Sequence, residues 1–207
     1  MNAGGCRPIP FWCRGNSLLC PLLTIATMNA SNPSFGRRSL RLKQYDYTAA
    51  GAYFLTVCRG EDAISFGSLS EGSVELNDAG LMIVEEWCGL EERFEGLELD
   101  AFVVMPDHIH GIVVLDGSAA ASRDPSASAR GVYRCGTSVP RIMQAFKSLT
   151  TKRYREIAAT GLRAYERRLW QRNYYEHVVR SEAELRAIRE YIALNPAKAD
   201  DRAHGLW

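Results

Sequence analysis

The chain lacks the features of a secreted or membrane protein. Its six cysteines include no C-x-x-C pair, and Cys58 and Cys88 lie inside apolar segments, as buried reduced cysteines do. No apolar run approaches the roughly 20 residues that span a bilayer. Net charge is also nearly absent, because 25 lysines and arginines face 24 acidic residues. We therefore expect a cytoplasmic protein in a reducing compartment, with no membrane partner.

The first 36 residues differ in composition from the rest of the chain. They contain the apolar run "SLLCPLLTIA", which is shorter than a signal peptide core and is interrupted by proline. Met28 offers a second start, so we expect residues 1–36 to be a disordered leader, or one that is not translated. The chain is long enough for one domain, expected over 37–200, with a short tail over 201–207. A Ser/Ala/Gly-rich segment predicts a flexible loop at about 116–140.

Hydrophobic periodicity predicts alternating strands and helices in the domain. A loop is expected between the first strand and the first helix. The order β-α-β-β-α-β with one closing helix is typical of an α+β fold of the ferredoxin-like or RRM-like kind, which has a four-stranded antiparallel sheet and helices on one face. Strands are predicted over 52–58, 102–105, 108–115 and 169–180, mainly from 175, and helices over 76–94, 139–158 and 181–196.

Two histidines interrupt the most apolar of these strands, "HIHGIVVL". Side chains alternate between the faces of a strand, so His108 and His110 share one face. Two neutral imidazoles side by side can provide half of a metal site. An isolated His-x-His pair is equally consistent with ordinary polar residues on a solvated face. The strand alone leaves both interpretations open.

The closing helix provides residues that can complete such a site. Ser181 and Glu184 fit a capping box at its start, and Pro196 is expected to end it. Tyr191 and Asn195 are four residues apart and lie on one face. If that face packs toward the histidines, Asn195 can be a third metal ligand and Tyr191 can reach a group bound to the metal. Alternatively, Tyr191 is the edge of the core stripe and Asn195 a helix stop before proline.

Three segments, "MPDHIHGIVVL", "WQRNYYEHVVR" and "IREYIALNPAKA", resemble in order and spacing the REP-associated tyrosine transposases. These are a branch of the single-tyrosine HUH transposases of small bacterial insertion sequences. The resemblance covers about residues 37–199. It implies that Tyr191, on the C-terminal helix, is the nucleophile and that His108, His110 and Asn195 are the metal ligands. Two imidazoles and an amide oxygen suit a divalent ion, Mg²⁺ or Mn²⁺, that acts on a phosphodiester.

The same resemblance implies a metal-dependent endonuclease and strand transferase. Its substrate would be single-stranded hairpin DNA of the repetitive extragenic palindrome type, which would be nicked through a 5′-phosphotyrosine intermediate. The protein would be located in the cytoplasm, at the nucleoid. Both a monomer and a homodimer fit. Two other functions stay open: a single-stranded nucleic-acid-binding module that has lost catalysis, and a rolling-circle replication initiator, which usually needs further domains.

Cations and aromatic residues on both sides of the histidine hairpin are candidates for contacts with DNA. RRM-like sheets bind single strands by stacking bases on exposed aromatic rings and following the backbone with cations. The C-terminal third of the chain is rich in arginine and lysine, which favours a phosphate-binding face there. The candidates are Arg37, Arg38, Arg41, Lys43, Tyr45, Tyr47, Lys147, Arg172, Tyr174 and Tyr175.

Overall fold

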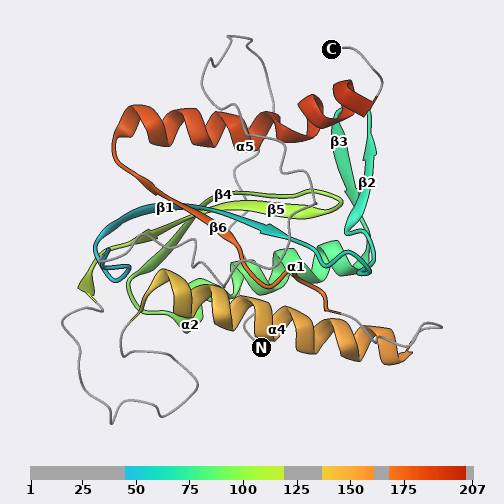
Figure 1. The fold of residues 1–207 in the computed structure, drawn as a ribbon, viewed down its shortest axis with the longest axis horizontal. Coiled ribbons are helices and arrows are strands. Elements are labelled where there is room, and N and C mark those ends of the chain that lie inside the picture. The colour runs from blue at the N-terminus through green and yellow to red at the C-terminus, as the bar shows by residue number, and fades with distance from the viewer. Residues whose placement is uncertain (1–44, 119–136, 161–167, 204–207) are drawn as a thin grey trace, which may run out of the picture. The chain divides into compact units, whose positions relative to one another are not determined.

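A computed structural model describes residues 45–118, 137–160 and 168–203, and Figure 1 shows their arrangement. The expected leader, the candidate cations Arg37, Arg38, Arg41 and Lys43, and most of the expected loop lie outside the described residues. Within the described part of the chain, no helix has the length and apolar character needed to cross a membrane.

Four strands form an antiparallel sheet in the order β4-β5-β1-β6. The first and third of these strands along the chain are central neighbours, which is the arrangement of a split βαβ fold. The α+β fold with a four-stranded antiparallel sheet is therefore confirmed. The strands are β1 (Gly51–Cys58), β4 (Leu97–Val104), β5 (His108–Leu115) and β6 (Tyr175–Val179).

Helices cover both faces of this sheet (Figure 1). On one face, Tyr53, Leu55 and Val57 of β1 join the main core, together with residues of α1 (Asp78–Cys88) and α4 (Val139–Thr160). A short helix, α2 (Leu90–Arg93), follows α1. On the other face, a smaller core joins the sheet to α5 (Glu182–Ala203). Because alternate residues of β1 point to opposite faces, one strand serves both cores.

The segment between β1 and α1 is not the loop that the sequence predicts. It forms a hairpin of β2 (Gly67–Ser70) and β3 (Ser73–Leu76), whose strands of four residues are too short for an alternation of polar and apolar residues to be distinctive. At its turn, Glu71 has a φ of 50° and Gly72 a φ of 73°, the left-handed conformations that tight hairpin turns use. The hairpin contacts α5, where the Gly72 N–H donates to Asp200 Oδ2 at 2.8 Å.

Three predicted boundaries were also wrong. Pro196 does not end α5, which continues to Ala203 and so includes the first residues of the expected tail. Contact with the β2–β3 hairpin holds this last part of α5 in place, although proline removes one helical hydrogen bond. Gly89 divides the helix predicted over 76–94 into α1 and α2. The strand predicted at 102–105 begins at Leu97, and its register shifts between Leu99 and Phe102.

Gly111, next to His110 in β5, lets the sheet approach α1 closely. A Cβ atom at this position would lie 2.5 Å from Cζ2 and 2.7 Å from Cη2 of the Trp87 indole. The indole is stacked on Phe102, with ring centroids 4.5 Å apart and an interplanar angle of 7°, and it is 2 % exposed. A ring packed in this way has no free space into which it can move.

We predict that Gly111→Ala lowers the free energy of unfolding by about 1–3 kcal/mol, because the added methyl group overpacks this contact. Gly89→Ala is the matched control: its backbone has a φ of −71°, and the nearest atom to an added Cβ is 3.5 Å away. The control should leave stability unchanged or slightly raised. Urea denaturation of both variants measures the difference, and equal stabilities would contradict the packing account.

Candidate active site

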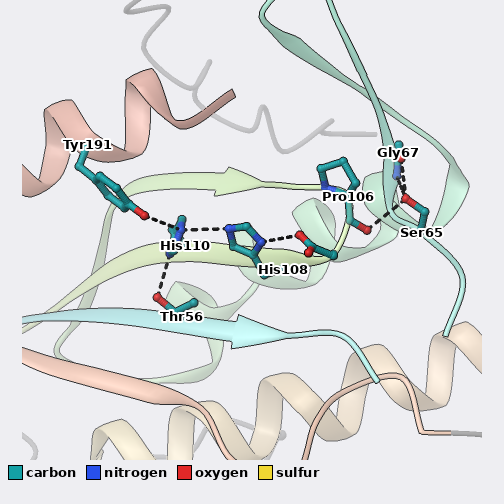
Figure 2. A network of polar contacts seen from close by, with 8 residues as sticks. Thr56, Ser65, Gly67, Pro106, His108, His110 and Tyr191 are labelled. Atoms are coloured by element: carbon teal, nitrogen blue, oxygen red, sulfur yellow. Dashed lines mark hydrogen bonds and ion pairs between the residues drawn. The ribbon is translucent and has the colours of Figure 1, made fainter. Parts of the chain in front are cut away.

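The two histidines of β5 lie side by side on the sheet face that α5 covers (Figure 2). Nε2 of His108 is 3.1 Å from Nε2 of His110. His110 is 5 % exposed, whereas the side chain of His108 is 23 % exposed. The predicted sharing of one face is therefore confirmed, and the pair is not on a freely solvated surface.

Each histidine has a partner on its other ring nitrogen, as Figure 2 shows. Oδ1 of Asp107 is 2.6 Å from Nδ1 of His108, and Oγ1 of Thr56 is 2.8 Å from Nδ1 of His110. The hydrogen bond to His108 lowers the pKa of Asp107, whose carboxylate can only accept. Nδ1 of His108 therefore donates, and in the neutral ring the Nε2 lone pair faces His110.

Sequence reasoning missed both of these partners. Asp107 lies between the strands predicted over 102–105 and 108–115, and its position next to His108 was a usable signal. In the structure its backbone carbonyl accepts from the Arg59 N–H at 2.9 Å, which fixes the turn. Thr56 had no local signal, because it reaches His110 only through the pairing of β1 with β5.

Burial keeps the His110 ring neutral. It lowers the pKa of His110 from 6.5 to about 3, with a smaller contribution from the neighbouring His108. A charged imidazolium would lose its hydration here and would lie against a second histidine. A neutral ring keeps one nitrogen available as an acceptor or a metal ligand.

Tyr191 extends from α5 toward the histidines. Its hydroxyl oxygen is 3.4 Å from Nε2 of His110, and its ring meets the His110 ring edge-on at 5.2 Å between centroids. The same ring packs edge-on against Phe54 at 6.1 Å and borders the smaller core. Tyr191 is thus at the edge of a core stripe and also points its hydroxyl at the histidine pair.

Asn195 lies one turn after Tyr191 and is 9 % exposed. Among the described residues, its side chain makes no hydrogen bond to either histidine. The described ranges also contain no group of three or more His, Cys, Asp or Glu side chains that could hold a metal ion. The assignment of Asn195 as a third ligand stays a prediction.

The donor set fits a divalent metal ion. Two nitrogen ligands that occupy adjacent positions about 2.1 Å from one ion are separated by about 3 Å. The two Nε2 atoms have this separation, at 3.1 Å, and Asp107 fixes the tautomer of His108 in the form that a metal ligand requires. For both lone pairs to face one ion, the proton of His110 must be on Nδ1, where the Thr56 hydroxyl can accept it.

Three of the candidate DNA contacts lie together in a groove whose lining does not include the histidines. Lys147, Arg172 and Tyr174 line one groove of about 620 Å³, whose wall also includes Arg141. Lys147 Nζ donates to the backbone carbonyls of Gln171 and Arg172, at 2.5 and 3.2 Å, and burial lowers its pKa. This groove gathers three of the basic residues that follow the histidine hairpin in sequence, Arg141, Lys147 and Arg172.

The candidate aromatic contacts are divided between core and surface. Tyr47 is 9 % exposed and belongs to the main core, and Tyr45 packs edge-on against it at 5.0 Å between ring centroids. Tyr175, by contrast, is 51 % exposed. Helix α5 covers most of the sheet face that RRM-like proteins leave open for bases, so only the margin of that face is available.

Sequence relatives identify the family. The family model described as "Transposase IS200 like" matches residues 132–195, a segment that contains Tyr191 and Asn195. A protein of Haemophilus influenzae whose function is uncharacterised is 34% identical over 164 residues, which are 77% of this chain and 88% of that protein. Another protein of the same organism, named as a REP-associated tyrosine transposase, is 25% identical over 153 residues, 74% of each chain. The chain belongs to the IS200-like transposase family, with the REP-associated tyrosine transposases.

Two solved structures are more distantly similar. A REP-associated tyrosine transposase bound to a REP hairpin shares 23% identity, with 80% of this chain and 74% of that chain covered and a TM-score of 0.47. A transposase from Deinococcus radiodurans shares 18% identity, with 74% and 95% covered and a TM-score of 0.42. These likenesses are weak, so the family assignment depends on the sequence relatives.

We predict that His110 makes the protein less stable as pH falls from about 6.5 toward 3. Over this range the imidazole of the unfolded chain binds a proton and the buried ring does not, because the pKa of His110 is about 3 in the folded protein and 6.5 in the unfolded chain. The slope from one such proton is at most about 1.4 kcal/mol per pH unit. Urea denaturation in EDTA at several pH values should give a shallower profile for His110→Gln than for the unmodified protein. Parallel profiles would contradict a neutral buried His110.

Proposed function

We propose that this transposase nicks and rejoins single-stranded hairpin DNA through a covalent bond to Tyr191, with the help of a divalent metal ion. The observation that carries the proposal is the position of the Tyr191 hydroxyl, 3.4 Å from a histidine nitrogen that is itself 3.1 Å from a second histidine nitrogen. A nucleophile beside two convergent, oriented imidazoles is the arrangement that metal-assisted phosphoryl transfer needs.

Tyr191 supplies the attacking atom. In the proposed step a bond forms between its phenolic oxygen and phosphorus, while the bond from phosphorus to the 3′ oxygen breaks. The phenol loses its proton to solvent, and the 3′ oxygen takes one up. The products are a 5′-phosphotyrosine and a free 3′-OH. One phosphoester bond has been exchanged for another, so no phosphoester is lost to water. A 3′-OH can therefore reverse the step on another DNA end without an outside energy source.

His108 and His110 would hold the metal, Mg²⁺ or Mn²⁺, with Asn195 as the proposed third ligand. When bound, the ion would act as a Lewis acid on the scissile phosphate and favour the phenolate. Asp107 and Thr56 orient the two imidazoles, and the packing of α5 on the sheet keeps Tyr191 pointed at them. Such positioning before reaction accounts for much of the rate gain in enzymes of this kind.

Single-stranded DNA suits this site better than duplex DNA, because an exposed and bendable phosphodiester can reach a hydroxyl that is held against a sheet. The groove lined by Lys147, Arg172 and Tyr174 is a candidate contact for the flanking backbone or for the hairpin stem. The same proposal includes these contacts, a hairpin repeat as the substrate, and a location of the protein at the nucleoid.

We predict that Tyr191→Phe keeps the fold and DNA binding but lowers covalent adduct formation by about 1,000-fold or more, because only the nucleophilic oxygen is removed. A hairpin-forming single strand labelled at its 3′ end, incubated with Mn²⁺, should co-migrate with the unmodified protein on a denaturing gel. Tyr175→Phe is the matched control and should still form the adduct. An adduct with Tyr191→Phe would contradict the assignment, and tight binding without any adduct would favour the binding-module alternative.

We also predict that His108→Ala and His110→Ala each abolish cleavage and that Asn195→Ala has a smaller effect, since two imidazoles would remain. His177→Ala is the control, because this histidine pairs with Glu184 at 2.7 Å and has no contact with the metal-site pair in the described structure. Circular dichroism should show that the variants are folded. Cleavage by the unmodified protein in excess EDTA would rule out the metal requirement.

A further inference from the structure

We propose that Tyr175 is a platform on which a base next to the scissile phosphate stacks. This inference depends on the proposed function, because it names a contact between this site and its single-stranded substrate. It concerns an aromatic side chain that takes no part in bond formation and lies on a different element from Tyr191.

Strand pairing places Tyr175 in the same row as His110. Thr56 of β1 is directly opposite His110 of β5 on one side and directly opposite Tyr175 of β6 on the other. Residues directly opposite each other in antiparallel strands point to the same face. Neighbouring strands are about 4.8 Å apart, so the backbone at Tyr175 lies about 10 Å from that at His110. The tyrosine ring therefore lies on the face that carries Tyr191 and the histidines.

Tyr175 is the residue of β6 that α5 leaves open on this face. The next residue with the same orientation, His177, is held by Glu184 at 2.7 Å, and Val179 packs against the smaller core. Tyr175 is 51 % exposed, and among the described residues nothing hydrogen-bonds its hydroxyl or stacks on its ring. An exposed aromatic ring beside a nucleic-acid site suits stacking, which tolerates any base.

The course of the chain before Tyr175 suggests where the strand continues. β6 is the edge strand of the sheet, and Tyr174, which precedes Tyr175, lines the groove that contains Arg172 and Lys147. Tyr174 packs against the main core, on the opposite face of the sheet from Tyr175. A single strand that leaves the site over Tyr175 would thus meet cationic side chains directly beyond the edge, where its phosphates find opposite charge.

The test combines protein variants with an abasic substrate. In the Tyr191→Phe background, where no bond is made, fluorescence anisotropy would measure affinity for a hairpin oligonucleotide that carries one abasic site, moved in turn through the nucleotides flanking the cleavage position. We expect Tyr175→Ala to weaken binding of the intact strand about 10-fold and Tyr175→Phe to change it less than about twofold. At one position, the abasic site should weaken binding by the parent protein about 10-fold as well. The same abasic site should not weaken binding by Tyr175→Ala any further.

The outcomes separate this inference from the proposed function. The stacking role would be overturned if Tyr175→Ala and Tyr175→Phe bound the intact strand with equal affinity. It would also be overturned if, at every position, the abasic site weakened binding by Tyr175→Ala as much as it weakens binding by the parent protein. Adduct formation with Tyr191 intact is measured on the same oligonucleotides. Lack of any adduct alongside non-additive binding would contradict the nuclease proposal and leave the stacking contact in place.

Discussion

The short distance between the two histidine nitrogens is the constraint on which the rest of the site depends. Two imidazoles whose Nε2 atoms lie 3.1 Å apart must share a proton or a cation, because two facing lone pairs repel. The fold maintains this contact from three directions: the turn before β5 positions Asp107, the pairing of β1 with β5 positions Thr56, and α5 positions Tyr191. Each partner comes from a different element, so the site forms only when β1, β5 and α5 have come together.

The packing of α5 explains how a sheet of this topology can carry both chemistry and binding. The helix covers most of one face and brings a tyrosine over the centre of the sheet, while the margin at β6 stays open. The opposite face is closed by α1 and α4, and the cationic groove lies where α4 meets the segment before β6. Contacts with the DNA that flanks the scissile phosphate are thus expected at the β6 edge of the sheet rather than over its middle.

Local patterns predicted the sheet and the shared faces of the candidate site residues, and the family resemblance then singled these residues out as a site. Alternation along β5 gave the shared face of His108 and His110, and helical spacing gave that of Tyr191 and Asn195. Features that depend on contacts between distant segments were missed. The strands of the β2–β3 hairpin have only four residues each, helix α5 continues through Pro196 because the hairpin supports it, and Thr56 becomes relevant only through strand register.

The central claim is that the histidine pair and Asn195 bind one divalent ion beside Tyr191. Anomalous diffraction from crystals of the Tyr191→Phe variant soaked in Mn²⁺ tests it most directly, since it locates the ion without depending on activity. The account predicts one peak at bonding distance from Nε2 of both His108 and His110, with the side-chain oxygen of Asn195 turned toward it. A peak bound elsewhere, or none at this position at saturating Mn²⁺, would contradict the claim.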